Sequence, residues 1–110
     1  MNNRLQQLLE FHAGNPEDPF LQYAIALEYI KSGDQASGLQ YFERLLQQAP
    51  EYIGTYYQLA KLYHSNGRKD DALQCLAQGI SMARKLNDQH TLAELINLKT
   101  NIELGLDDES

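Results

Sequence analysis

The sequence holds few of the features that mark secreted or membrane proteins. It has a single cysteine, Cys75, so no disulfide can form within the chain, and we expect a reducing compartment. The opening segment, MNNRLQQLLEFH, has no apolar core of the kind that secretory signals carry. No apolar run approaches the roughly 20 residues needed to cross a bilayer. These absences predict a soluble, cytoplasmic protein that does not engage a membrane.

The sequence also lacks the motifs of common enzymes and cofactor sites. It contains no G-x-x-x-x-G-K-[ST] phosphate loop, no G-x-G-x-x-G and no G-x-S-x-G. His12, His64 and His90 lie far apart and share no helical face, and Cys75 has no histidine or second cysteine nearby. We therefore predict that the chain is not an enzyme and has no catalytic residue, no metal site and no cofactor.

Basic residues are in the minority, with 9 Lys and Arg against 15 Asp and Glu and a formal net charge of −6. This balance argues against general nucleic-acid binding, because neutralising phosphates requires clustered Lys and Arg. Residues 55–99 nevertheless carry 6 basic and 4 acidic side chains, whereas residues 1–54 carry 3 and 7. The basic middle either steers a carboxylate of a partner toward the chain or is simply a solvated surface.

Proline is scarce as well, and all three prolines lie at expected helix boundaries. Asp18 followed by Pro19 is a strong helix start, and Gly33 and Gly67 are placed to end helices in the left-handed conformation. No segment shows the alternation of a strand, so the pattern predicts an all-α fold. We expect about six helices, at residues 3–13, 19–31, 35–48, 53–65, 69–86 and 89–105.

One stretch of sequence occurs twice in a related form. IALEYIKSGDQASGL, residues 25–39, and LAKLYHSNGRKDDAL, residues 59–73, are 34 residues apart. The positions that coincide are Ala26 and Ala60, Tyr29 and Tyr63, Gly33 and Gly67, and Leu39 and Leu73. The polar residues between them differ, so the repeated feature is the packing pattern. Two helices per 34 residues predict a helical solenoid in which each pair stacks on the next.

This pattern resembles the tetratricopeptide repeat family. The family pattern has, in order, a small residue, an aromatic residue, a glycine, a second small residue, a large apolar residue and a proline. The first repeat matches it with Ala26, Tyr29, Gly33, Gly38, Phe42 and Pro50. The second repeat matches all but the proline, with Ala60, Tyr63, Gly67, Ala72 and Leu76. The resemblance implies a right-handed solenoid of antiparallel helix pairs in one domain, residues 1–106. Its parts would be a half repeat at 3–16, repeats at 19–52 and 53–86, a capping helix at 89–105 and, beyond the domain, an acidic tail at 107–110.

The chain departs from the family pattern at three places. Gln22 lies where the family usually has an aromatic residue, although Tyr56 keeps that pattern in the second repeat. Arg84 lies where a proline would end the second repeat, and Thr100 lies where a turn glycine is expected. We therefore expect the last helix to continue as a cap.

The resemblance implies a protein–protein interaction module without enzymatic activity, because first helices in this family line a concave, peptide-binding groove. Carried over, the peptide-binding residues are Tyr23, Leu27, Ile30, Lys31, Tyr57, Lys61 and His64, with Phe20, Gly54 and Ser65 at the remaining groove positions. The set does not form the family's Lys/Asn carboxylate clamp, since Tyr23 and Leu27 occupy its places. In a second interpretation, Leu27 and Ile30 only pack on the preceding or the capping helix.

An alternative function is a self-assembling structural subunit, which forms a homo-oligomer through its terminal helices. The end of a helical array leaves an apolar stripe uncovered unless its terminal helix is polar outside. We expect Leu98 and Leu104, off the main apolar face of the last helix, to suit such a contact.

Overall fold

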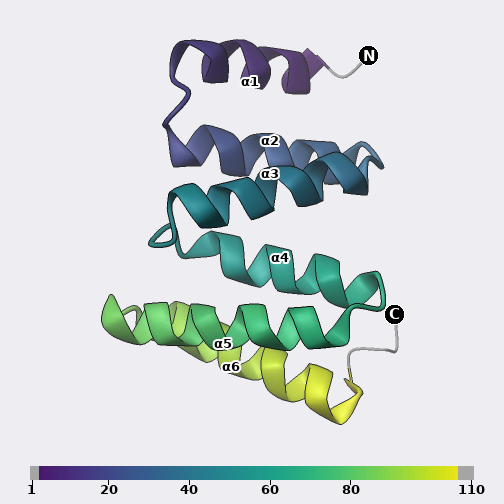
Figure 1. Ribbon diagram of the computed structural model, residues 1–110, viewed down its shortest axis with the longest axis vertical. Helices are drawn as coiled ribbons and strands as arrows, with labels where there is room; N and C mark the ends of the chain where they lie inside the picture. The colour runs from purple at the N-terminus through teal and green to yellow at the C-terminus, as the bar shows by residue number, and fades with distance from the viewer. Residues whose placement is uncertain (1–2, 107–110) are drawn as a thin grey trace. The chain divides into compact units, whose positions relative to one another are not determined.

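A computed structural model of the chain describes residues 3–106. Within this range it contains six helices and no strand (Figure 1). The helices are α1 (Asn3–Gly14), α2 (Pro19–Lys31), α3 (Gln35–Gln48), α4 (Gly54–Ser65), α5 (Lys69–Lys85) and α6 (Gln89–Leu104). The all-α prediction is confirmed, and no helix boundary differs from its predicted place by more than one residue. The acidic tail predicted at residues 107–110 lies outside the described residues.

The chain divides into two compact units, Met1–Tyr52 with α1, α2 and α3, and Ile53–Ser110 with α4, α5 and α6. The division falls where the second predicted repeat begins. We call them unit 1 and unit 2. That residues 1–106 form a single domain stays a prediction.

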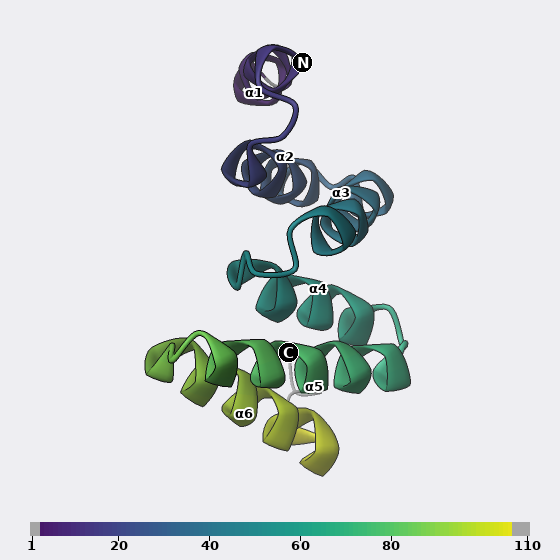
Figure 2. The same cartoon turned by 60° about the vertical axis from the view of Figure 1, so that its left-hand side comes forward.

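In unit 1, α2 and α3 pack against each other as an antiparallel pair, and α1 packs on α2 (Figure 2). Ile25 and Ala26 of α2 and Phe42 and Leu45 of α3 are fully buried. Gly38 lies where the pair is closest, because a Cβ atom there would be 2.5 Å from Cγ1 of Ile30 and 3.1 Å from the carbonyl oxygen of Ala26. The small residue at this position of the repeat therefore allows α2 and α3 to approach closely.

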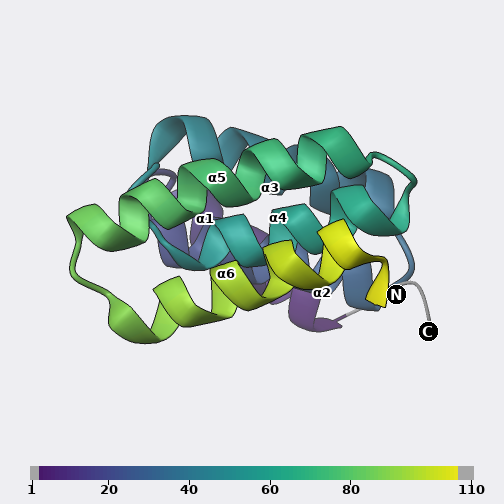
Figure 3. The same cartoon turned by 90° about the horizontal axis from the view of Figure 1, so that it is seen from below.

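In unit 2, α4 packs against both α5 and α6 (Figure 3). The fully buried side chains come from all three helices and are those of Thr55, Leu59, Ala60, Ala72, Leu76, Ala83, Leu95 and Ile102. A Cβ atom at Gly79 would lie 2.6 Å from Cβ of Tyr56 and 3.1 Å from Cδ1 of Leu95. Gly79 is thus a second close-approach glycine, which the repeat pattern did not indicate.

Three of the turns end their helices in the same way. The prediction that Gly33 and Gly67 adopt the left-handed conformation is confirmed by their φ angles of 92° and 76°, and Asn87 adopts it at 57°. In each turn the next amide donates to the carbonyl five residues earlier, from Asp34 to Tyr29, from Arg68 to Tyr63 and from Asp88 to Ala83, each at 2.9 Å. This is the Schellman arrangement, which satisfies carbonyl groups that a helix end would leave unpaired.

Aspartate side chains begin three of the helices. Asp18, Asp34 and Asp88 accept hydrogen bonds from the backbone amides of Phe20, Ser37 and Thr91, at 2.9, 3.1 and 3.0 Å. These bonds pair amides of the first helical turn that have no partner within the helix. They also hold the pKa of the Asp34 and Asp88 carboxyl groups below the ordinary value, with a second bond from the Ser37 or Thr91 hydroxyl adding to the effect.

Candidate functional site

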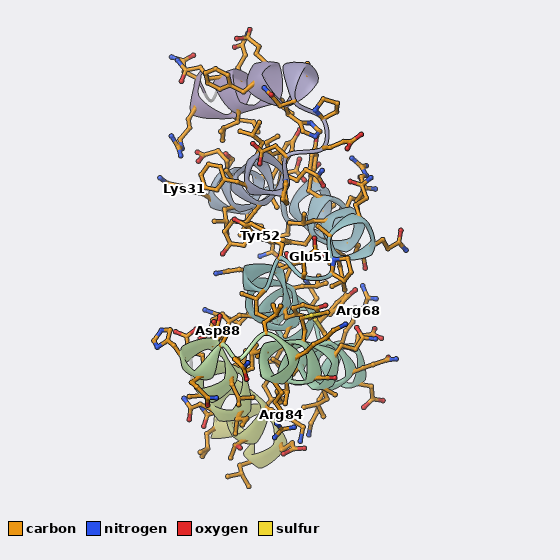
Figure 4. The ribbon with its side chains drawn as sticks, turned by 90° about the vertical axis from the view of Figure 1, so that its left-hand side faces the viewer. Lys31, Glu51, Tyr52, Arg68, Arg84 and Asp88 are labelled. Atoms are coloured by element: carbon orange, nitrogen blue, oxygen red, sulfur yellow. The ribbon has the colours of Figure 1, made fainter. Side chains whose placement is uncertain are left out.

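The unit 1 part of the predicted groove lies on α2. Leu27, Ile30 and Lys31 follow Tyr23 by four, seven and eight residues, which places all four on one face of the helix. Tyr23, Leu27 and Ile30 are half-buried, whereas Lys31 is exposed and points away from the helix (Figure 4). This face therefore offers a partly apolar surface with a cation at its C-terminal end.

Tyr23 is held in place by two other aromatic rings. Its ring centroid lies 5.8 Å from that of Phe42 on α3 and 5.5 Å from that of Tyr52, which follows α3. Burial raises the pKa of Tyr52, and the neighbouring Tyr23 and Asp18 raise it further, so its phenol is neutral at pH 7. Contacts of this kind fix a ring without hiding it, which suits a rigid contact residue.

Ile30 has a packing role of its own. Its Cγ1 and Cδ1 atoms lie over Gly38 of α3, 2.5 and 3.0 Å from where a Cβ atom would be. The alternative interpretation placed Ile30 against the preceding or the capping helix, but its side chain contacts the following helix. Packing against α3 therefore accounts for the place of Ile30 in the α2 set.

The unit 2 part of the predicted groove lies on α4. Lys61 and His64 follow Tyr57 by four and seven residues, so the three share one helical face. Nζ of Lys61 lies 5.5 Å from the centroid of the Tyr57 ring, within the range of a cation–π contact. Tyr57 and His64 are half-buried and Lys61 is exposed. That the α2 and α4 sets together line one groove stays a prediction.

The nucleophilic and titratable side chains of the described residues offer little reactive chemistry. Cys75 is buried, its Sγ lies 3.5 Å from the carbonyl oxygen of Tyr56, and burial raises the pKa of its thiol to about 12. A thiol in this state is not a nucleophile at pH 7. Between residues 3 and 106 no three His, Cys, Asp or Glu side chains gather closely enough to hold a metal ion. Over the same range, no helix combines the length and apolarity that crossing a membrane requires.

The structure also contains a cavity of about 500 Å³ in unit 1, which sequence reasoning missed. It lies between the α1–α2 connection, the start of α2 and the end of α3, and its lining residues are Pro16, Glu17, Pro19, Gln22, Gln48 and Ala49. The available signal was Gln22, whose polar side chain replaces the aromatic residue usual at its place in the repeat.

Comparison with known proteins identifies the family. Residues 29–96 match the sequence pattern of a family described as "Tetratricopeptide repeat". No curated protein matches the chain. A tetratricopeptide repeat domain protein from Salinibacter ruber, solved by NMR, is 45% identical with a TM-score of 0.77, over 80% of this chain and 89% of that one. A crystal structure of such a protein from the same organism is 44% identical with a TM-score of 0.75, over 78% and 96%.

A third solved structure extends the likeness in fold to almost the whole chain. It is a protein from Bordetella parapertussis that is 19% identical, with a TM-score of 0.81 over 99% of this chain and 95% of that one. The sequence match, the identity to the Salinibacter ruber domain and the paired helices agree, and the predicted class of helical repeat fold is confirmed. The chain belongs to the tetratricopeptide repeat family.

Proposed function

We propose that this chain binds a peptide segment of a partner protein along the predicted groove faces of α2 and α4. Tetratricopeptide repeat domains are in general non-enzymatic modules of protein–protein interaction. The segment would contact the predicted set, Tyr23, Leu27, Ile30, Lys31, Tyr57, Lys61 and His64. The single cysteine favours action in the cytoplasm.

The observation that carries this proposal is the pair of Tyr57 and Lys61 on α4. A half-buried ring offers a large contact area while losing little side-chain entropy on binding, because the helix already fixes it. Lys61, stacked over that ring, is exposed and can donate hydrogen bonds to a carboxylate or a backbone carbonyl. Tyr23 occupies the equivalent place on α2, 34 residues earlier, and its ring is fixed by Phe42 and Tyr52.

The test begins with a pull-down from a lysate of the native organism and continues with the purified partner. Changing Tyr57 and Lys61 together to Ala should weaken binding at least tenfold. Replacing an aromatic or cationic anchor residue of an interface by alanine typically costs about 2 kcal/mol or more of binding free energy. Helicity and melting temperature should stay nearly unchanged, because Lys61 is exposed and Tyr57 only half-buried.

The matched control changes exposed glutamines on the second helices of the pairs. Gln40→Ala on α3 and Gln74→Ala on α5 should leave the affinity within twofold of that of the unchanged protein, because neither residue belongs to the groove set. If these changes abolish binding while the Tyr57 and Lys61 pair does not, the partner uses the second helices and the groove proposal is wrong.

A second candidate function is self-assembly through the terminal helices, favoured by exposed apolar side chains there. Phe11 of α1 is 62% exposed and Leu104 of α6 is 66% exposed. Leu98 was also predicted to suit this contact, but it is only 4% exposed, so that prediction is wrong. Leu98 lies three residues after Leu95 and four before Ile102, which places all three on the buried face of α6.

Sedimentation equilibrium at micromolar concentration tests self-assembly. A homo-oligomer that dissociates when Leu104 is changed to Glu, but not when the exposed Asn97 is changed to Glu, would support it. A monomer at all concentrations would leave peptide binding as the remaining proposal.

A further inference from the structure

We propose that the cavity of unit 1 binds an aliphatic primary ammonium group, such as the end of a lysine side chain. None of the seven groove residues lines this cavity, so the inference goes beyond the proposed function and does not depend on it. The cavity measures about 500 Å³, which is ample for a four-carbon chain with its ammonium.

Gln22 is the residue that points to a ligand. It is only 3% exposed, and its Nε2 donates to the carbonyl oxygen of Pro16 at 3.2 Å. Its Oε1 is buried and has no hydrogen-bond partner among residues 3–106. Exchanging the positions of Oε1 and Nε2 would not satisfy both atoms, because Oε1 would then face the Pro16 carbonyl oxygen, which is also an acceptor. A buried acceptor left unpaired is unfavourable, so a ligand that donates a hydrogen bond to it gains affinity.

Most of the remaining lining lacks free donors and favours a ligand with a positive charge. Pro16 and Pro19 have no backbone N–H, and the amide of Ala49 is already paired with the carbonyl of Leu45 at 2.8 Å. Glu17 adds a carboxylate, and no Lys, Arg or His is among the lining residues. Residues 1–52 as a whole carry 3 basic and 7 acidic side chains. A cation with several N–H groups can donate to these acceptors and is attracted by the negative charge, whereas an anion is repelled.

The lining distinguishes an ammonium on an aliphatic chain from a bare cation. Two proline rings and the methyl group of Ala49 contribute apolar surface on which methylene groups can lie. An ammonium has three donors and no acceptor, so its donors match the Glu17 carboxylate and the Gln22 oxygen. The terminal torsion of a glutamine is broad, so the side-chain amide can turn to present Oε1 to a ligand in the cavity.

The experiment is a titration of ¹⁵N-labelled full-length chain with n-butylammonium, followed by NMR. We expect saturable shifts of the Gln22 side-chain amide and of the backbone amides of Glu17, Gln48 and Ala49. Butyrate and n-butanol, which keep the chain but lack the cationic donor, should not produce these shifts. Shifts spread over acidic surfaces of both units, with no saturation at the cavity, would overturn the proposal.

Variants connect the shifts to the two acceptors. Gln22→Leu removes the unpaired oxygen at similar size, and Glu17→Gln removes the charge at an exposed position where folding is not at risk. Each should weaken butylammonium binding about tenfold, the usual effect of losing a hydrogen bond to a charged group. Gln47→Leu, on the exposed surface of α3 outside the cavity, is the matched control and should bind like the unchanged protein. Equal affinity in Glu17→Gln and the unchanged protein would overturn the proposal, even if Gln22→Leu does not fold.

A lysine side chain of a partner and a free aliphatic amine share this chemistry, and a further titration separates them. If N-acetyl-lysine methylamide shifts the same amides in the same concentration range as butylammonium, the ligand is a lysine side chain of a polypeptide. If only the free amine binds, the ligand is a small molecule.

Discussion

The absence of a Cβ atom at Gly79 allows the helices of unit 2 to approach closely at this residue. In a helix, alanine is favoured over glycine by about 1 kcal/mol, because glycine loses more backbone freedom on folding. At Gly79 a Cβ atom would lie 2.6 Å from Cβ and 2.8 Å from Cγ of Tyr56. Cβ is attached directly to the backbone, so Tyr56 cannot withdraw by rotating its side chain. The steric cost should therefore exceed the gain in helix propensity.

We expect Gly79→Ala to lower the free energy of unfolding by about 1–2 kcal/mol, the usual range for overpacking. Gly14→Ala is the matched control, because a Cβ atom at Gly14 would have no neighbour within 4 Å. It should leave stability unchanged or raise it slightly. Urea unfolding curves followed by circular dichroism would measure both. Equal stability of the two variants would show that α4 and α5 can separate at this point without loss.

At the scale of the helices, the turns that end α2, α4 and α5 rely on a left-handed residue. Gly67 is surrounded by open space, since a Cβ atom there would meet nothing within 4 Å. Its φ of 76° is therefore the obstacle to a residue that has a Cβ atom. Asn87 adopts φ 57° in the equivalent turn, so the arrangement tolerates an asparagine.

Gly67→Val should destabilise the protein by about 1–2 kcal/mol, because a β-branched residue is strained in the left-handed conformation. Gly67→Asn should cost clearly less than the valine, as Asn87 indicates. Thermal melts of the two variants beside the unchanged protein would decide this. A valine variant as stable as the asparagine variant would mean that the turn rearranges to avoid positive φ.

The start of α6 gives a prediction about pH. Hydrogen bonds from the backbone and the hydroxyl of Thr91 lower the pKa of Asp88 in the folded protein. A lowered folded-state pKa means that the carboxylate stabilises the fold above its unfolded pKa of about 3.9. That contribution is lost as the pH falls through the lower, folded-state pKa. Asp88→Ala should therefore reduce the melting temperature at pH 7.

Below the folded-state pKa, the melting temperatures of Asp88→Ala and of the unchanged protein should converge, because the carboxyl group is then protonated in both the folded and the unfolded state. Asp88→Asn is the control, since its side chain still caps the helix but does not titrate. It should keep most of the stability at pH 7. A difference between the alanine variant and the unchanged protein that stays constant from pH 7 to pH 2 would exclude the carboxylate as its source.

At the scale of the whole molecule, the helices contribute very unequally to the two cores. Leu8 is the one buried residue within α1, and α1 packs on α2. In α5 six residues are buried, and the helix packs against both α4 and α6. Because local opening exposes only what a helix buries, its free energy should follow these differences.

Amide hydrogen exchange should accordingly be fastest in α1 and slowest in α5. Mass spectrometry of deuterated peptides, or NMR, would rank the helices in native buffer. If α1 exchanges as slowly as α5, residues 3–104 open as one cooperative unit. That result would contradict the expected ranking and would support the single domain predicted from the sequence.

Much of the candidate site depends on contacts that no repeat pattern specifies. Tyr57 and Lys61 could be paired from their spacing on one helix, and the structure places the cation over the ring. Ile30 could not be assigned in this way, because its contact with Gly38 depends on how α3 returns along α2. The cavity beside Gln22 could not be foreseen either, since its lining comes from three separate segments.

The sequence by itself determined the helices, the 34-residue period and the left-handed residues Gly33 and Gly67. These features depend on interactions within a few residues of the chain, such as capping by Asp18 and the absence of a Cβ atom in glycine. Only the tertiary structure decided the burial of Leu98, the close approach at Gly79 and the unpaired oxygen of Gln22. Each of these depends on which surfaces of distant helices meet, because side chains contact one another in space and a local pattern does not record their partners.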